Sequence, residues 1–415
     1  MQSKMNFYEL DNGLKLYFYP DYTKHSVMVN LIVKFGGIYS DYMIDGKHYH
    51  LVDGMAHLLE HYTIEQSKYG IIIPELTKRF MKANGYTNRN RTVYYFDAVK
   101  YIDEGLNLLL KGIHSPVFTE ERLAFTKNSI REEIRADQDS LDSRMNQIKM
   151  EQLFKAYSYR STIGTIEQIN NITIRDVENA FYSFYQPANE IIVVAGNFDE
   201  KEMLEKIKTL YQELNFSSYK VEMKKIKEPK EVNKKEDTLY FPTARPIYEL
   251  TFKVPVHHMS VEQKMKLDWY LSIFLDMNFG ILSPVRQKLK NEKIIDQSIQ
   301  NSFSVFEDYW LIQIGSYTEQ KEVFKKEIFN VLKTPVVDKE IYDLSINESK
   351  MYVSLRPEQL NKIVGPFIEN LIMFRHPYLD EVEYLDTFSF KEYLNMINQL
   401  DFSSFIETEV IDTEK

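Results

Sequence analysis

Two histidines and a glutamate lie close together in the stretch LVDGMAHLLEHYTIEQ, whose other residues are typical of a buried helix. Residues four apart on a helix lie on the same face, so His57 and His61 can direct two imidazoles at one point. Such a pair is half of a zinc site, and Glu60 can accept a proton from water that zinc activates. A single histidine on an apolar face is usually a satisfied core residue, but this spacing is rarer by chance. The pattern therefore predicts a hydrolytic zinc centre with Glu60 as its general base.

A catalytic zinc ion needs a third protein ligand, and the stretch TEERLAFTKNSIREEIRADQD offers one. Leu123, Ile130 and Ile134 mark the buried stripe of this predicted helix. Glu133 flanks the stripe, whereas Glu132 points away from it and is interpreted as a solvated surface acid. We therefore predict that Glu133 is the third ligand, on a separate helix packed against the first.

The composition narrows the classes of function. The 415 residues carry a net charge of −10, which argues against nucleic acid as a partner because phosphate binding requires a basic surface. The chain has no cysteine, which excludes disulfides, thiolate metal ligands and a cysteine nucleophile. The start, MQSKMNFYELDNG, does not resemble a secretory signal, and no apolar run approaches the roughly 20 residues of a membrane-spanning helix. We expect a cytoplasmic protein with no nucleic-acid or membrane partner.

A Lys- and Glu-rich segment, residues 217–238, nearly bisects the chain and is predicted to be a solvated linker. The halves 1–216 and 239–415 share an order of elements. SVMVNLIVKFG is predicted to be a half-buried strand, followed by a helix with Asp53 as its N-cap. PIYELTFKVP repeats the strand, followed by a helix with Ser260 and Gln263 as a capping box. We therefore expect two related α+β domains, of which only the first has metal-binding residues.

The sequence HLLEH is also the inverted zinc motif HxxEH, in which the glutamate precedes the second histidine. GMA precedes it, EEI follows about seventy residues later, and ANGYTNRNRTVYYF lies between them. Together these stretches resemble the insulinase/pitrilysin family of zinc peptidases, well over the first half and weakly over the second. The resemblance implies Zn²⁺ as cofactor, with His57, His61 and Glu133 as metal ligands and Glu60 as the catalytic general base.

The resemblance further implies an α+β fold of two similar domains, each an antiparallel sheet flanked by helices, that forms half of a clam-like peptidase chamber. A second peptidase-like subunit is then implied, more consistent with a zinc-less heteropartner than with a second copy. The implied activity is a zinc-dependent endopeptidase that cleaves small or unfolded peptides, including leader or precursor peptides. The ANGYT stretch corresponds to a sheet edge to which a peptide adds as a strand, so Ala83, Asn84 and Gly85 are predicted substrate contacts. An ordinary edge strand is the alternative.

Two positions depart from the family pattern. Many members have an acidic residue, which supports the zinc ligands, at the position of Thr126, so the orientation of the ligands is in question. The second domain often supplies an Arg and a Tyr that hold the substrate. Here LSPVRQKLKNEKIIDQSIQ has Lys290 near the Arg position and no Tyr, which indicates that a partner subunit supplies the pair.

Two other classes of function stay open. The same fold occurs in catalytically silent structural or peptide-binding subunits, which typically lack one or more of the four site residues that this chain retains. A peptide-binding chaperone with a closed structural zinc site would need a fourth protein ligand. No other histidine has the helical spacing for that role, and His48 and His50 are interpreted as loop residues.

Overall fold

The computed structural model describes residues 5–44, 46–157, 162–214, 216, 221–224, 226–355, 359–375 and 381–413. The chain forms two compact units, each with its own hydrophobic core. The first comprises residues 1–137, 160–225 and 358–366, and the second comprises 138–159, 226–357 and 367–415. Residues 138–159, which the sequence analysis placed in the first domain, therefore belong to the second unit.

The first unit contains a six-stranded sheet whose order is β1-β2-β8-β3-β7-β6. Its strands are β1 (Asn6–Glu9), β2 (Lys15–Pro20), β3 (Val27–Val33), β6 (Lys82–Thr87), β7 (Thr92–Ala98) and β8 (Glu190–Gly196). Neighbours are antiparallel except β2 and β8, which run parallel. All seven residues of β3 are buried, so the prediction of a half-buried strand is wrong. A strand in the middle of a sheet that is covered on both faces has no solvent side.

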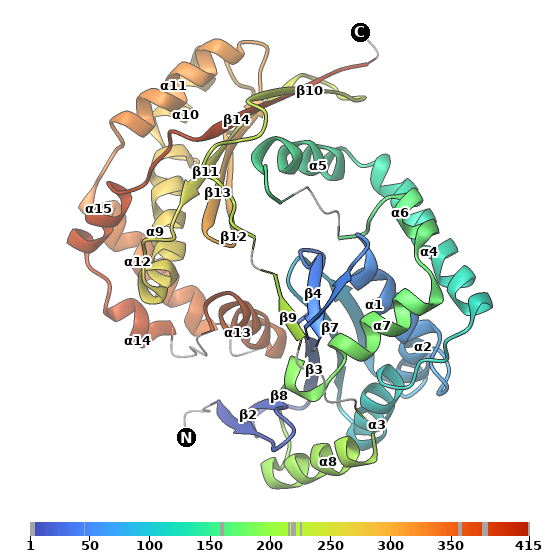
Figure 1. Ribbon diagram of the computed structural model, residues 1–415. Helices are drawn as coiled ribbons and strands as arrows, with labels where there is room; N and C mark the ends of the chain where they lie inside the picture. Colours follow the sequence, from blue (N-terminus) through green and yellow to red (C-terminus); the bar gives the residue numbers. More distant parts are fainter. Residues whose placement is uncertain are drawn as a thin grey trace. The chain divides into compact units, whose positions relative to one another are not determined.

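Helices and a small second sheet complete the first unit (Figure 1). The helices are α1 (Met55–Glu65), α2 (Ile72–Thr77), α3 (Ile102–Ile113), α4 (Glu120–Gln138), α6 (Ile166–Asn171), α7 (Ile174–Phe184), the 3₁₀ helix η1 (Pro187–Asn189) and α8 (Glu200–Glu213). The small sheet has the order β5-β4-β9, formed by β4 (Asp41–Ile44), β5 (Lys47–His50) and β9 (Val221–Met223). His48 and His50 therefore lie in a strand, and their interpretation as loop residues is wrong.

The second unit contains a five-stranded sheet with the order β10-β14-β11-β13-β12. Its strands are β10 (Glu236–Tyr240), β11 (Ile247–Pro255), β12 (Gln300–Phe306), β13 (Tyr309–Tyr317) and β14 (Phe405–Ile411). Only β10 and β14 run parallel. The five strands β2-β8-β3-β7-β6 of the first unit have the same order along the chain and the same directions. The two units thus share one topology, as the repeated order of elements in the sequence predicts.

The second unit also contains eight helices among the described residues, and α13 spans the boundary between the residue ranges of the two units. They are α5 (Leu141–Leu153), α9 (Val261–Phe279), α10 (Pro284–Asn291), α11 (Lys321–Lys333), α12 (Lys339–Leu355), α13 (Leu360–Phe374), α14 (Glu381–Asp386) and α15 (Phe390–Ile397). The predicted capping box of Ser260 and Gln263 is confirmed at the start of α9. Helix α5 packs on β10 and β14, where the Gln152 amide donates to the Glu407 carbonyl oxygen at 3.0 Å.

The predicted linker is only partly described, because residues 217–220 and 225 lie outside the described residues. Its other residues include β9 and the start of β10. Glu228 is buried and pairs with Lys253 Nζ at 2.7 Å. The prediction of a fully solvated connector is therefore wrong, since a buried ion pair fixes the middle of the segment.

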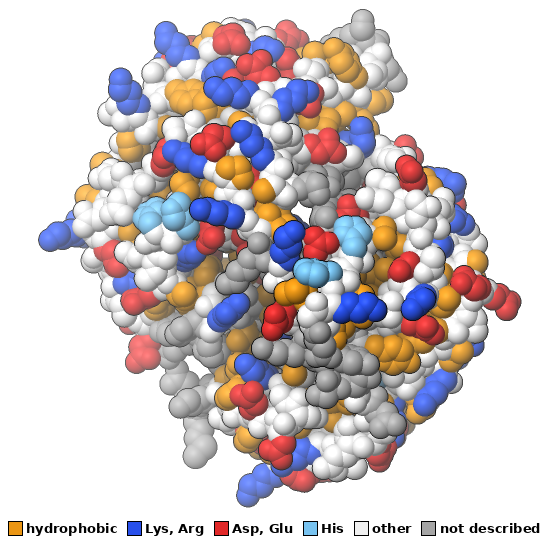
Figure 2. Space-filling view, viewed as in Figure 1, with side chains coloured by type: hydrophobic (Ala, Val, Ile, Leu, Met, Phe, Trp, Pro, Cys, Tyr) orange, Lys and Arg blue, Asp and Glu red, His pale blue; other side chains and the backbone are white. Residues whose placement is uncertain are grey.

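The surface visible in Figure 2 mixes both signs of charge. Lys and Arg side chains alternate with Asp and Glu side chains across this face and form no single extended patch. Among the helices that the structure describes, none is long and apolar enough to cross a membrane.

Candidate metal centre

Helix α1 is fixed in the core of the first unit by its own sequence. Gly54 precedes it with a φ of 84°, and a Cβ at this residue would lie 2.5 Å from the Ile163 carbonyl oxygen, so the helix start requires glycine. The predicted N-cap is wrong, because α1 has no side-chain cap and Asp53 instead accepts a bond from Gln168 Nε2 at 2.8 Å. Most of α1 is buried, but the side chains of His57 and His61 remain 15% and 19% exposed. The two imidazoles thus lie at an accessible edge of a rigid helix.

Helix α4 carries the third predicted ligand. Leu123, Ile130 and Ile134 are buried, as the stripe predicts. The Glu132 side chain is 73% exposed and pairs with Arg135, whereas the Glu133 side chain is 45% exposed and turns toward α1. The structure therefore brings together His57, His61 and Glu133 and leaves Glu132 on the surface.

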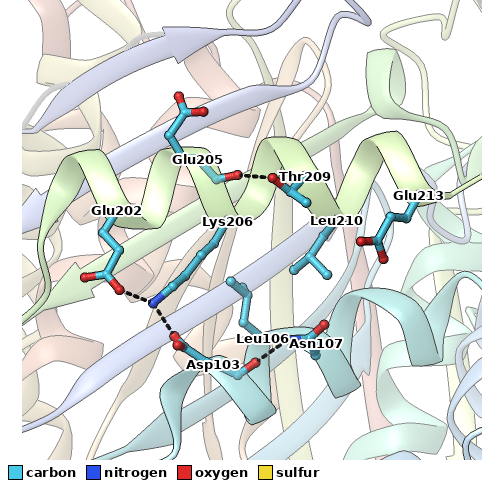
Figure 3. A pocket seen from close by; sticks show the side chains of 9 residues that line it. All are labelled: Asp103, Leu106, Asn107, Glu202, Glu205, Lys206, Thr209, Leu210 and Glu213. Atoms are coloured by element: carbon cyan, nitrogen blue, oxygen red, sulfur yellow. Dashed lines mark hydrogen bonds and ion pairs between the residues drawn. The ribbon is translucent and has the colours of Figure 1, made fainter.

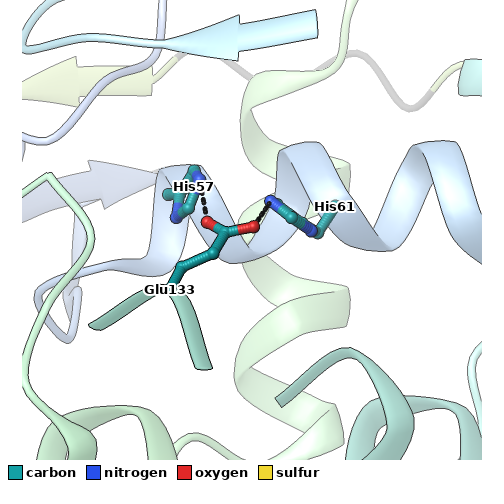
Figure 4. A group of neighbouring side chains, drawn as sticks. All are labelled: His57, His61 and Glu133. Atoms are coloured by element: carbon teal, nitrogen blue, oxygen red, sulfur yellow. Dashed lines mark ion pairs between the residues drawn. The ribbon is translucent and has the colours of Figure 1, made fainter. Parts of the chain in front are cut away.

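The three side chains converge on one point (Figure 4). Glu133 Oε2 lies 3.5 Å from His57 Nε2, and Glu133 Oε1 lies 3.3 Å from His61 Nε2. One ligand atom from each residue lies within 4.8 Å of the other two, the only such group among the described residues. A tetrahedral zinc ion with bonds of about 2.0–2.1 Å keeps its ligand atoms about 3.3 Å apart. The donor set and its spacing therefore fit zinc, and the 45% exposure of the Glu133 side chain places the group at the surface of the unit.

The electrostatic surroundings shift the pKa values of the two histidines in opposite directions. Burial, with a smaller contribution from the charge of His61, lowers the pKa of His57 to about 3, so its imidazole is neutral near pH 7. Burial also acts to lower the pKa of His61, but the hydrogen bond to Glu65 and the charges of Glu133 and Glu60 outweigh it and raise that pKa. His57 is therefore already in the neutral form that can bind a metal ion, whereas the carboxylates around His61 favour its protonated form, which must release a proton on metal binding.

Glu60 lies beside the histidines but is not one of the converging groups. Its residue is 5% exposed, and its Oε2 accepts a hydrogen bond from Thr87 Oγ1 at 2.7 Å. Burial raises the pKa of Glu60, and the bond from Thr87 acts in the opposite direction. A buried carboxylate held by one donor retains a free oxygen, which suits it to proton transfer.

The free oxygen of Glu60 faces strand β6. A Cβ built on Gly85 would lie 3.0 Å from Glu60 Oε1 and 2.9 Å from Ile64 Cδ1, so any side chain at this residue would displace the glutamate. Strand β6 ends the six-stranded sheet and, among the described strands, pairs only with β7. Of the other predicted contacts on this strand, Asn84 is exposed and Ala83 packs partly against the core. The structure therefore brings an edge strand next to the predicted general base.

Two predicted or possible sites do not join this centre. Lys290 lies exposed on α10 in the second unit. A cavity of about 360 Å³ lies between α3 and α8, which carry none of the predicted site residues (Figure 3). Lys206 Nζ on α8 donates to Asp103 on α3 at 2.7 Å and to Glu202 on its own helix at 2.6 Å. These acids are neutralised within the protein, so the cavity is not a second candidate active site.

The sequence analysis did not predict two residues that contact the metal centre or its general base. Thr87 bonds to Glu60, and Glu65 Oε1 lies 3.2 Å from His61 Nδ1. Glu65 follows His61 by one helical turn in HYTIE, so the sequence contained a signal for it. Thr87 lies on a strand, and no local spacing points to its contact.

Comparison with known proteins gives matches over most of the chain. The family model described as "Insulinase (Peptidase family M16)" matches residues 19–166, and the model "Peptidase M16 inactive domain" matches residues 171–342. The zinc protease YmfH of Bacillus subtilis is 24% identical over 336 residues, which is 80% of this chain and 78% of YmfH. The residues of the metal centre fall within the first match.

Solved structures show the same fold at low identity. A putative M16-like peptidase from Alicyclobacillus acidocaldarius matches with a TM-score of 0.88 at 20% identity, over 100% of this chain and 99% of that one. The periplasmic protease PqqL from Escherichia coli matches with a TM-score of 0.76 at 16% identity. All of this chain is covered there, but only 48% of PqqL, so one PqqL chain has about twice the length of this fold.

Proposed function

This chain belongs to the insulinase family of peptidases (peptidase M16), and we propose that it is the zinc-binding subunit of a metalloendopeptidase for small or unfolded peptides. One observation carries the proposal: the nitrogen and oxygen atoms of His57, His61 and Glu133 converge at spacings that suit zinc, next to a buried Glu60 that faces an edge strand. Leader and precursor peptides are substrates of the proposed kind, because they are short and extended.

The residues around the metal centre have different roles in the proposed hydrolysis of peptides. A zinc ion held by the three ligands supplies a Lewis acid that polarises a carbonyl and makes water more acidic. Glu60 takes the proton of the attacking water and returns it to the leaving amine. Thr87 holds one oxygen of Glu60 at 2.7 Å, so the other oxygen is directed to the side of Gly85.

Strand β6 is the proposed binding site for the peptide. Its outer edge has no neighbour in the described sheet, so its main-chain groups can pair with an extended peptide and make few demands on its sequence. Ala83, Asn84 and Gly85 then contact the peptide main chain. Gly85 lets the peptide approach Glu60, because there is no side chain between them.

A second peptidase-like subunit completes the proposed assembly. The length of PqqL, about twice that of this fold, supports a pairing of two such halves. We propose a zinc-less heteropartner, rather than a second copy, that supplies the substrate-holding Arg and Tyr, with Lys290 as this chain's own contact. The cytoplasmic location stays a prediction from the sequence.

A catalytically silent subunit is the second candidate. The match of residues 171–342 to a model described as an inactive domain favours it, but this match does not include the metal centre. Zinc content and peptide cleavage separate the two functions.

The test is cleavage of a mixture of unstructured peptides, read by mass spectrometry, with zinc measured by plasma emission. The chain is assayed alone and with whatever partner co-purifies with it. We expect Glu60→Gln to abolish cleavage while zinc stays stoichiometric, because the variant keeps all three ligands but loses the proton acceptor. The matched control is Glu132→Gln, an exposed acid beside Glu133, which should cleave at the parent rate. Cleavage by Glu60→Gln at the parent rate would refute the mechanism, and a parent that purifies without stoichiometric zinc and does not cleave would favour the silent subunit.

A further inference from the structure

The two imidazoles of the metal centre have different support on the side away from Glu133. His57 Nδ1 is buried and has no hydrogen-bond partner among the described residues. His61 Nδ1 instead lies 3.2 Å from Oε1 of Glu65, the last residue of α1. A single carboxylate on the same helix therefore fixes the ring of only one of the two predicted ligands.

The second oxygen of Glu65 is also held. Thr126 Oγ1 on α4 donates to Glu65 Oε2 at 2.9 Å and accepts a bond from Gln66 Nε2 at 3.3 Å. Thr126 and Gln66 are both buried. Thr126 lies two helical turns before Glu133 on the same helix. The bond therefore ties the carboxylate that contacts His61 to the helix that carries the third ligand.

We propose that Glu65, locked by Thr126, is the positioning residue that orients His61 for zinc. A proton on Nδ1 donated to Glu65 leaves the Nε2 lone pair directed at the point shared with Glu133. The position of Thr126, where an acid was expected from the resemblance, thus holds a hydroxyl that fixes an acid supplied by α1. This inference rests on the proposed zinc site and identifies a residue that acts on it without contacting the metal.

The charge of Glu65 also contributes to the proposed role. Two neutral imidazoles and the carboxylate of Glu133 bring one negative charge to a divalent ion. Glu65 brings a second, through His61, so that the centre and a zinc ion are together neutral. A carboxylate behind a histidine ligand makes the imidazole a stronger donor, and its loss typically weakens metal binding about 10- to 100-fold.

The alternative is that Glu65 only stabilises the end of α1 through an i,i+4 pair with His61. That role would lower the stability of the metal-free protein and leave its zinc affinity unchanged. The proposed role of Glu65 would instead leave the stability of the metal-free protein nearly unchanged and lower its zinc affinity when the residue is replaced. Zinc affinity of the metal-free protein, measured by competition with a chromophoric chelator, therefore separates the two.

We expect Glu65→Gln to bind zinc about 10- to 100-fold more weakly than the parent, with the melting temperature of the metal-free protein nearly unchanged. Thr126→Val keeps the carboxylate but removes its lock, and we expect a smaller weakening of about 3- to 10-fold on the same argument. Glu132→Gln, an acid that contacts neither histidine, should bind zinc as the parent does. If Glu65→Gln does not fold, the zinc affinity of Thr126→Val tests the inference in its place.

Zinc affinity of Glu65→Gln within twofold of the parent would overturn the inference, as would an unchanged affinity of Thr126→Val when only that variant folds. A parent that binds no zinc at all would instead overturn the proposed function. The failure of the two proposals can therefore be told apart.

Discussion

The buried pair of Lys253 and Glu228 gives the sharpest prediction on stability. Lys253 Nζ donates to Glu228 Oε1 at 2.7 Å, to the Leu153 carbonyl oxygen at 2.9 Å and to the Pro229 carbonyl oxygen at 2.8 Å. The Lys253 side chain is fully buried and also lies 4.8 Å from the centre of the Phe154 ring. One ammonium thus joins β11, the end of α5 and the predicted linker.

Replacing Lys253 with Met keeps the volume and removes all three donors. Glu228 would retain backbone N–H bonds from residues 155–157, but its buried charge would lose its counterion, and two carbonyl oxygens would lose a donor. Removing one partner of a buried ion pair costs about 3–5 kcal/mol. With a slope of about 2–3 kcal/mol per molar urea for a unit of this size, the midpoint should fall by about 1–2.5 M.

Tryptophan fluorescence during urea unfolding is the assay, because both tryptophans of the chain, Trp269 and Trp310, lie in the second unit. The matched control is Lys264→Met, since Lys264 pairs with Asp308 at the surface and should cost less than about 1 kcal/mol. A loss below 1 kcal/mol for Lys253→Met, or one equal to that of the control, would refute the reasoning.

Two other changes test the geometry at strand β6 and the burial of a carboxyl group. Gly85→Val should lower kcat/KM at least tenfold with zinc retained, because its Cβ would lie 3.0 Å from Glu60 Oε1. The control is Lys82→Val on the same strand. Equal activity of the two variants would contradict the prediction. Burial, with the charges of Glu369 and Glu381, raises the pKa of Asp268 from 3.8 to about 6, so its charge destabilises the folded state increasingly as pH rises through that range and fully above it. The raised pKa corresponds to at most about 3 kcal/mol, which we reduce to about 1–2 kcal/mol because the side chain is partly accessible. Asp268→Asn should therefore be more stable than the parent at pH 8 and equal to it near pH 3.5 in urea melts. Glu348→Gln, at an exposed position of α12, should show no such trend, and a gain in stability that is independent of pH would contradict the assignment.

Local signals in the sequence predicted local structure well. The capping box at Ser260 needs only residues within one turn, and it is present at the start of α9. The stripe of Leu123, Ile130 and Ile134 depends only on helical period, and it correctly separated Glu133 from the exposed Glu132. The same period placed the two histidines on one face of α1.

Features that depend on distant partners could not be predicted in this way. Asp53 has the type of an N-cap, but it accepts a bond from Gln168 instead, and the left-handed Gly54 begins the helix. The support of the metal centre joins residues 61 apart for Thr126 and Glu65, and 27 apart for Thr87 and Glu60. Periodicity reports which face of an element is buried, and it carries no information on which remote side chain meets that face.

The course of the chain through α5 restricts how this protein can be divided. Met145 of α5 packs with Leu239, Ile247 and Val410, so a helix encoded early in the sequence completes its core only with the last strand. A fragment that stops at residue 216 would expose this helix to water, and a fragment that starts at residue 239 would lack it. During synthesis α5 must wait, without its packing partners, until strand β14 has left the ribosome.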